Sequence, residues 1–456
     1  MNKFFLKKIF KKISFISFLF IVTSLSVNAQ DYQKNVRVKK FQNIDAVTLV
    51  VATVNSKDNN IITLINAKNN KLKNQSSYII FYNEMLRKKW RLRLNKNENI
   101  EIKGQDLFID DHENIYVLGE VWDSNIRNEQ KFIAKYNSQG KKQWDQKLSN
   151  IDDFIKLQKI LVKNNNIYVL GTKFRGKNNV VLYKFDDSGN FIFNQNYDDL
   201  GFGDNSIDRS IIAKIDENEN IYIAGQTSLR LKNSSLVSPF ILKLDFNGNL
   251  IFKELFGVPD YNLYVSSLDI DEEKNIYLVG SLTTRSDNLV SFYYNNENIK
   301  VNQYSLLSGI EDCFILKFSS KENKKEWIRT YGNVNHNTKI HDIKVYENQI
   351  YVVGYSTEIL DINQQMNKEF EKPNIFVKQF DFNGKENLFY SVPYAVNGDA
   401  AIGFNRIKLN VNDNGDLIIG GSVRASEEIK SNIHYYGALI KITNNKKVAN
   451  NLHPVD

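Results

Sequence analysis

The chain of 456 residues carries 60 lysine and arginine residues against 52 aspartate and glutamate residues, and 42% of its residues are hydrophobic. The formal net charge is +8, but five lysines lie in the first 29 residues, which hold no acid, so the rest of the chain carries only +3. This small charge argues against the basic surface of a nucleic-acid-binding protein. The single cysteine, Cys313, excludes an intramolecular disulfide, so packing must stabilise the fold.

Residues 1–29 have the pattern of a secretory signal peptide. Lys3 to Lys12 form a basic segment, Ile13 to Leu25 an apolar run, and Val27-Asn28-Ala29 a small-residue cleavage site. An uncleaved membrane anchor is the alternative, although the run is shorter than the roughly 20 residues that a membrane span needs. No cysteine follows the run, which argues against a lipid-anchored lipoprotein. We therefore expect residues 30–456 to be one domain that is secreted, periplasmic or on the cell surface, without membrane insertion after cleavage.

A short motif recurs along the rest of the chain. Five copies read Ile-Tyr-x-x-Gly and begin at Ile115, Ile167, Ile221, Ile276 and Ile350, and two degraded copies begin at Ile61 and Leu417. Seven copies at a period of about 50 residues predict a radial array of small sheets, a β-propeller.

The segments around each copy predict four strands per repeat. An alternating segment and a tight, polar turn precede the motif, as in 106–110 and 267–271, and a second apolar run follows it, as in 240–244. In most repeats a glycine turn then leads to a strand that begins near an aromatic residue. Two tight hairpins joined by a looser connection make a four-stranded antiparallel blade. The expected fold class is therefore all-β, a seven-bladed β-propeller of four-stranded antiparallel blades.

The seventh blade lacks a clear fourth strand after residues 438–442. At the other end of the chain, residues 35–41 alternate in the manner of a strand and precede the first repeat at the right spacing. We predict that this N-terminal strand completes the seventh blade and closes the ring, which removes exposed sheet edges. The alternative is that Lys446 to Leu452 fills that place, although the hydrophobic alternation is weaker there.

The repeat resembles that of the secreted bacterial seven-bladed β-propeller repeat family, abbreviated SBBP. The resemblance rests on an acidic turn, the Ile-Tyr-Val-x-Gly motif, a Phe-Ile-x-Lys run and a Trp-x-x-x-Tyr-Gly segment, of which residues 326–332 are the best match. It covers essentially the whole chain after residue 29. The resemblance implies the architecture and no single activity, so no catalytic residue can be transferred from it.

Insertions that break the repeat are the first candidates for a binding surface. In a four-stranded meander the two tight hairpins share one face of the disc, and the longer connections share the other face. Two long connections, 281–313 and 355–374, lie in adjacent repeats, and Trp122 lies in a shorter one. Such loops are either neutral insertions or working parts. The candidate binding residues are Trp122, Asp287, Phe292, Tyr293, Tyr294, Tyr304, Glu311, Asp312, Glu358 and Asp361.

Motifs that carry catalysis or bind a cofactor are absent, since there is no GxSxG, HExxH, CxxC or phosphate-binding glycine loop. His336 and His341 beside Asp342 have a spacing that fits neither a helix turn nor one strand face, so we predict no metal there. Acidic hairpins such as 216–220, 271–275 and 410–415 could bind calcium, but Asx side chains also stabilise turns unaided. We therefore expect no cofactor.

Two sets of residues recur at fixed places in the repeat and are expected to be structural. One set is Lys135, Lys184, Lys243, Lys317 and Lys441, which we predict to pair with neighbouring blades. The other set is Trp90, Trp144 and Trp327, which we predict to pack between blades.

Two functional classes remain open. The first is a monomeric binding module that presents its variable loops to a protein or glycan partner. The second is a propeller-type hydrolase or lyase with acidic residues at the mouth of the central channel. A pair of carboxylates converging near the axis would favour the enzyme, and the positions of Asp204, Asp208, Asp260 and Asp342 are the first to check.

Overall fold

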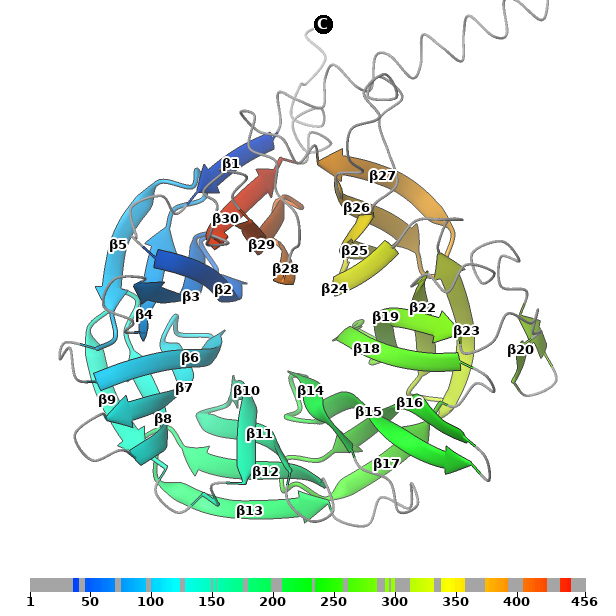
Figure 1. Ribbon diagram of the computed structural model, residues 1–456, viewed down its shortest axis with the longest axis horizontal. Helices are drawn as coiled ribbons and strands as arrows, with labels where there is room; N and C mark the ends of the chain where they lie inside the picture. Colours follow the sequence, from blue (N-terminus) through cyan, green and yellow to red (C-terminus); the bar gives the residue numbers. More distant parts are fainter. Residues whose placement is uncertain are drawn as a thin grey trace, which may run out of the picture.

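A computed structural model shows a ring of seven four-stranded antiparallel sheets, the architecture of a seven-bladed β-propeller (Figure 1). The described residues form strands and turns and include no helix. Accordingly, no helix in this part of the chain is long and apolar enough to cross a membrane. The structure describes residues 36–40, 46–69, 75–95, 100–123, 128–148, 151–152, 154–174, 179–197, 207–231, 234–256, 261–284, 292–294, 297–299, 312–331, 338–356, 374–392, 405–424 and 435–443.

Each blade runs from an inner strand at the axis to an outer strand at the rim, as Figure 1 shows. The inner strands are β2 (Ala46–Asn55), β6 (Ile100–Ile109), β10 (Ile155–Lys163), β14 (Ile207–Ile215), β18 (Tyr261–Ile270), β24 (Thr338–Tyr346) and β28 (Asn405–Val411). The second strands, which carry the repeated motif, are β3 (Ile61–Asn69), β7 (Ile115–Asp123), β11 (Asn166–Lys173), β15 (Ile221–Leu231), β19 (Ile276–Thr284), β25 (Gln349–Ser356) and β29 (Leu417–Arg424).

The third strands are β4 (Gln75–Tyr82), β8 (Asn128–Tyr136), β12 (Asn179–Asp186), β16 (Ser234–Leu244), β22 (Asp312–Ser319), β26 (Asn374–Asp381) and β30 (Tyr435–Ile442). The outer strands are β5 (Lys88–Arg93), β9 (Lys142–Lys147), β13 (Phe191–Tyr197), β17 (Leu250–Leu255), β23 (Lys324–Tyr331), β27 (Glu386–Val392) and, for the seventh blade, β1 (Val36–Lys40). A small extra hairpin, β20 (Phe292–Tyr294) with β21 (Glu297–Ile299), lies in the connection between β19 and β22. In Figure 1 it projects outside the ring of blades.

The N-terminal strand closes the ring, as the sequence predicted. β1 pairs antiparallel with β30, and the register places Val36 opposite Ile442 and Lys40 opposite Ala438. The seventh sheet therefore has the order β1-β30-β29-β28, with three strands from one end of the chain and one from the other. The rival segment, 446–452, lies outside the described residues, and β1 occupies the place beside β30.

The core lies between neighbouring blades, because each sheet is covered on one face by the preceding blade and on the other face by the following blade. One cluster, for example, joins Tyr116 and Leu118 of the second blade to Leu157 and Val169 of the third blade. Burial on both faces explains why the motif reads as a continuous apolar run rather than a clean alternation. The motif residues Ile276, Tyr277, Leu278 and Val279 are all fully buried.

Side chains also bond to the backbone of the next inner strand at every junction between blades. The donors are backbone N–H groups, and the bonds are Gly104 to Asn66 Oδ1 (3.0 Å), Ile160 to Asp106 Oδ2 (3.1 Å), Ile211 to Gln158 Oε1 (3.0 Å), Val265 to Gln226 Oε1 (2.8 Å), Val345 to Asp269 Oδ2 (2.9 Å), Leu409 to Asp342 Oδ2 (2.9 Å) and Val50 to Ser422 Oγ (2.9 Å). These bonds give partners to N–H groups that are buried or partly buried, and they fix each blade against its neighbour.

The recurring lysines and tryptophans hold the tight turns of neighbouring blades. Trp90, Trp144 and Trp327 donate their indole N–H to backbone carbonyls of Ser138, Asp187 and Phe382 in the following blade, at 3.2, 3.0 and 3.0 Å. Among the lysines, Lys135 pairs with Asp187 at 2.6 Å, while Lys184 and Lys441 donate to the carbonyls of Phe246 and Glu84 at 3.0 Å. Lys317 pairs with Glu326 of its own blade, and Lys243 lies over the ring of Tyr222. The predicted structural role is confirmed, with neighbour pairing in three of the five lysines.

Candidate functional site: the axial pocket

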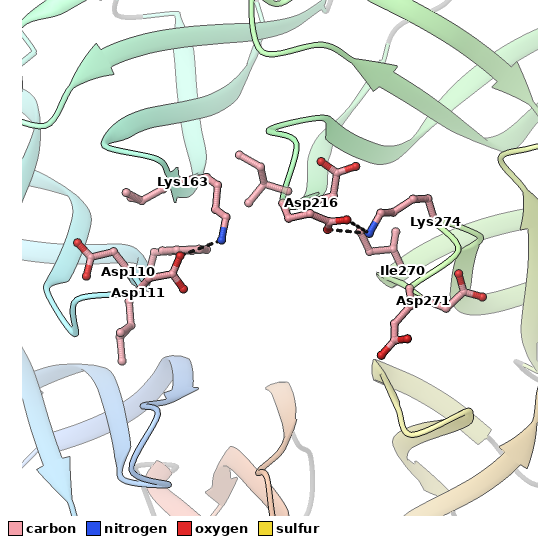
Figure 2. A pocket seen from close by; sticks show the side chains of 13 residues that line it. Asp110, Asp111, Lys163, Asp216, Ile270, Asp271 and Lys274 are labelled. Atoms are coloured by element: carbon pink, nitrogen blue, oxygen red, sulfur yellow. Dashed lines mark hydrogen bonds and ion pairs between the residues drawn. The ribbon is translucent and has the colours of Figure 1, made fainter.

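A pocket of about 370 Å³ opens where the inner strands of four consecutive blades end at the axis. Its walls come from the turns after β6, β14 and β18 and from the end of β10, so it lies on the face that bears the tight hairpins (Figure 2). Six carboxylates line it, namely Asp110, Asp111, Asp216, Glu217, Asp271 and Glu272, together with two lysines, Lys163 and Lys274. The lining therefore has a formal charge of −4.

Three of these carboxylates are built into the hairpin turns. Asp110 Oδ1 accepts the backbone N–H groups of His112 and Asn114 at 2.9 and 2.8 Å, and Oδ2 accepts the Asn114 amide and the Tyr116 hydroxyl at 2.8 and 3.1 Å. Asp216 and Asp271 make the same bonds to Asn and Tyr residues four and six positions on. An aspartate, an asparagine and the motif tyrosine thus form one repeated Asx turn.

Two further carboxylates are held by lysines from the next blade (Figure 2). Lys163 lies 2.8 Å from Asp111, and Lys274 lies 2.6 Å from Glu217. The hydrogen bond from Lys163 lowers the pKa of Asp111, and that from Lys274 lowers the pKa of Glu217. Both acids are exposed, so the pairs add little to stability. They do keep the two carboxylates ionised at the rim.

This arrangement suits the recognition of charge better than proton transfer. A glycosidase-type site needs one carboxyl group with a raised pKa to act as acid and a second as base or nucleophile. Here the pKa values of Asp111 and Glu217 are lowered, and the oxygens of the three turn aspartates already accept hydrogen bonds. Asp111 and Glu217 therefore present negative charge at the rim of the pocket.

Removal of divalent metals should leave the fold unchanged. The oxygens of the turn aspartates accept N–H and O–H donors, which calcium would have to displace before it could bind. We expect the same melting temperature with and without EDTA, measured by circular dichroism. A large fall in EDTA that calcium reverses would show that the hairpins bind metal. No group of three or more His, Cys, Asp or Glu side chains with metal-binding geometry occurs among the described residues.

None of the predicted binding residues that the structure describes lines this pocket. Trp122 lies near the end of β7, on the opposite face of the disc, and is 40% exposed. Asp312 begins β22 and is only 1% exposed, so this residue is not part of a loop surface. The short strand β20 consists of Phe292, Tyr293 and Tyr294. Asp287, Tyr304, Glu311, Glu358 and Asp361 lie outside the described residues.

Of the four acids expected near the axis, only Asp342 has a side chain that the structure describes. Asp342 lies within the inner strand β24 and is buried. Its carboxylate accepts the Leu409 N–H and a short hydrogen bond from the Ser267 hydroxyl. Its role is to hold blades together. His341 lies in the same strand, Asp208 belongs to β14, and Asp204, Asp260 and His336 lie outside the described residues.

The pocket was not predicted from the sequence, because the candidate binding residues were chosen where insertions break the repeat. The pocket is made by positions within the repeat, just after the turn aspartate. The signal was available there, since Asp111, Glu217 and Glu272 all follow that aspartate directly. Three acids at one repeat position, from blades two, four and five, must lie on one arc of the ring.

Comparison with known proteins gives only distant structural resemblances. No family model matches it, and no curated protein is similar to it. Solved structures that resemble it include the polysaccharide lyase Uly1, with 12% identity, coverage of 86% of this chain and 89% of that chain, and a TM-score of 0.49. The β-propeller domain of the Trilobed protease from Pyrococcus furiosus has 10% identity, coverage of 88% and 97%, and a TM-score of 0.43. The WD40 domain of SCAP from fission yeast has 9% identity, coverage of 90% and 99%, and a TM-score of 0.40. Likenesses this distant say nothing about what the chain binds.

Proposed function

We propose that the protein is a non-enzymatic binding module that presents the long loops of blades five and six to a protein or glycan partner. The observation that carries the proposal is the contrast between the two faces of the disc. On the hairpin face, every described turn between first and second strands has two or five residues. On the other face, the second-to-third connections range from two residues in blade four to 17 in blade six and 27 in blade five. Uniform turns are what a scaffold needs, and variable loops are where binding residues concentrate.

The partners of five of the six carboxylates that line the pocket support binding over catalysis. Asp111 and Glu217 are ion-paired, and the three turn aspartates are occupied by their own hairpins. The enzyme alternative would need a carboxyl group poised to donate a proton.

Export and family membership are part of the same proposal. The signal-like residues 1–29 lie outside the described residues, and their sequence pattern supports secretion, with the mature ring in the periplasm, at the cell surface or outside the cell. The motifs support membership of the SBBP family, and we propose that the ring acts as a monomer without bound nucleic acid or cofactor.

A loop-trimmed variant tests the proposal. Residues 285–309 and 358–372 are each replaced by Asn-Gly, which makes a two-residue turn that continues the pairing of Leu282 with Asp312 and of Ser356 with Asn374. The ring should keep its circular dichroism spectrum and melting temperature, because long surface loops contribute little to stability. Binding in a glycan panel and in cross-linking with native envelope material should be lost.

A matched control trims a loop of the same kind. Residues 425–434 join β29 to β30, and Arg424 pairs with Tyr435, so Asn-Gly can replace them in the same way. This control should retain binding. If the doubly trimmed ring, folded as before, binds everything that the unaltered ring binds, the loops are not the binding surface and the axial pocket becomes the leading site.

A further inference from the structure

Large apolar side chains are exposed at the rim of blades three and four, on the face opposite to the loops on which the proposed function rests. Nine such side chains are exposed among the described residues, and five of these belong to the hairpin ends of two neighbouring outer strands (Figure 1). We call these five residues the rim patch: Phe191 and Ile192 of β13, Leu250 and Ile251 of β17, and Phe246 in the turn before β17.

Contacts between the two blades bring the rim patch together. Phe193 follows Ile192 directly, and a Cβ atom on Gly248 would lie 3.2 Å from its ring. Gly248 is in the same turn as Phe246. The ammonium nitrogen of Lys184, in blade three, lies 5.5 Å from the centre of the Phe246 ring and 5.9 Å from the centre of the Phe193 ring. The turn that carries Phe246 thus lies against the start of β13, and the apolar residues of the two blades adjoin.

The register of the outer strands shows that the rim patch departs from the repeat. In blades one to six the outer strand has a bulge near its start, and the residue before the bulge and the bulge residue have equivalent positions in each blade. These pairs are Lys88-Lys89, Lys142-Gln143, Phe191-Ile192, Leu250-Ile251, Lys325-Glu326 and Glu386-Asn387, in chain order. The fold therefore accepts polar residues at both positions. Two adjacent blades that expose apolar pairs there instead indicate a contact surface.

The strand β13 is also open at its outer edge. It is the last strand of the sheet β10-β11-β12-β13, and it contains no charged residue along Phe191–Tyr197. Each of the other outer strands contains at least one charged residue. Because charged side chains on an edge strand discourage pairing with another chain, β13 is the outer strand with the least protection against the addition of a further strand.

Carboxylates border the rim patch. Asp186 ends β12 at the turn into β13, and Asp245 directly precedes Phe246. Glu219 comes close from the inner hairpin of blade four, because the Tyr168 hydroxyl lies 2.6 Å from Glu219 Oε2 and 3.2 Å from the carbonyl oxygen of Phe246. Among the described residues, none of these three acids forms an ion pair within 4.0 Å. Their negative charge is therefore available to a ligand.

The neighbouring lysines do not cancel this charge. Lys184 is only 7% exposed, and its ammonium group donates to a backbone carbonyl of blade four at 3.0 Å. Asp187 is already paired with Lys135, and the adjacent residues Lys253 and Glu254 on β17 have opposite formal charges. Three carboxylates against one largely buried ammonium group give the border of the patch a formal charge of −2.

We propose that the rim patch binds an extended, basic segment of a partner protein, whose apolar side chains cover the patch and whose lysine or arginine side chains lie beside Asp186, Asp245 and Glu219. Charge complementarity selects this occupant. A second copy of the ring would bring two acidic borders together, and a membrane of anionic lipids would have the same sign of charge as the border. The inference does not depend on the long loops of blades five and six, which lie on the other face.

Binding is measured by fluorescence anisotropy on the full ring, with a labelled peptide of three Lys-Leu-Lys-Phe repeats as the probe. We expect saturable binding that the double variant Ile192→Gln, Ile251→Gln weakens about tenfold. This variant should fold, because Gln143 occupies the same bulge position in blade two. Leu49→Gln is the matched control, since Leu49 is an exposed apolar residue of blade one. It should bind the peptide like the unaltered ring.

A second double variant, Asp186→Asn with Asp245→Asn, removes charge and keeps the turns. Asn83 and Asn137 occupy this turn position in blades one and two, and their side chains accept the same backbone N–H four residues on. We expect about threefold weaker binding of the peptide, and a smaller loss of affinity on addition of salt than in the unaltered ring. Asp381→Asn, at the same turn position in blade six, is the control and should change neither.

Several results would overturn the proposal. The peptide can also reach the acidic axial pocket, and equal binding by the unaltered ring and both double variants would assign it there. Equal affinity for a peptide of Glu-Leu-Glu-Phe repeats would contradict the preference for a basic segment. A dimer in sedimentation velocity, or flotation with phosphatidylglycerol vesicles, that Ile192→Gln with Ile251→Gln abolishes would place a second copy or lipid on the patch instead. The ring trimmed at both long loops should bind the peptide normally, so this proposal and the proposed function fail separately.

Discussion

A chain that begins at residue 43 should melt about 5 °C below the chain that begins at residue 30, at a cost of several kcal/mol. The shorter chain lacks β1, so it loses the five paired positions between β1 and β30, at about 1 kcal/mol for each net hydrogen bond. It also loses the covalent link between blade seven and blade one, because the chain runs directly from β1 into blade one. Blade seven would then meet blade one only through bonds such as Val50 to Ser422 and Lys441 to Glu84, and through packing of Leu439 and Ile418.

Two controls separate closure from a general effect of truncation. A chain that begins at residue 35 keeps all of β1 and should melt like the longer chain. A synthetic peptide of residues 30–42, added to the chain that begins at 43, should restore part of the lost stability by pairing with the free edge of β30. Equal melting temperatures for the chains beginning at 30 and 43 would show that β1 does not hold the ring closed.

The architecture could be predicted because burial between blades imposes a pattern on every repeat. Residues such as Tyr168, Tyr222 and Tyr277 are fully buried at one repeat position, and their hydroxyl groups reach the acidic turns. Such positions recur in the sequence because the same local contacts recur in space. The closing strand was also predictable, since a ring with six outer strands after its motifs leaves a single gap.

The roles of individual acids could not be predicted in the same way. Asp342 is one of the acids that the sequence places near the axis, but its carboxylate, like those of Asp106 and Asp269, reaches the backbone of the next inner strand. Whether a carboxylate reaches that backbone depends on the angle between two blades and on the bulge that shifts each inner strand, and periodicity carries no information about either. The loops at 285–311 and 357–373 are insertions outside the repeat, so periodicity does not place their residues. The binding role of those residues stays a prediction.

The repeated glycine is the second place where a small change should have a large effect. Gly280 pairs with Val265 on β18, at the point where the register of that strand shifts by one residue. A Cβ atom at Gly280 would meet the Tyr264 carbonyl oxygen far inside contact distance and would lie 2.8 Å from the Phe314 ring. The carbonyl belongs to an inner strand that is held by its sheet partner and by the neighbouring blade. Moving the carbonyl away would therefore cost free energy.

Gly280→Ala should therefore destabilise the ring by on the order of 3 kcal/mol or more, measured by urea unfolding. Gly119→Ala is the graded comparison, since its Cβ would lie 2.9 Å from the Lys103 carbonyl and 2.6 Å from the Phe132 ring, a side chain that can shift. It should cost less. Ser281→Ala, at the buried neighbour of Gly280, removes an atom instead of adding one and should change stability by less than about 1 kcal/mol.

The first blade shows why this expectation depends on local backbone and not on the motif alone. Ile65 occupies the glycine position there, opposite Val50 and a similar register shift, and is fully buried. A side chain is thus tolerated where the inner strand is built around it. If Gly280→Ala unfolds at the same urea concentration as the unaltered ring, β18 can make the same adjustment, and the glycine reflects shared ancestry of the repeats rather than a steric need. A loss larger than that of Gly119→Ala would establish that close approach of the inner-strand carbonyl fixes the glycine in blade five.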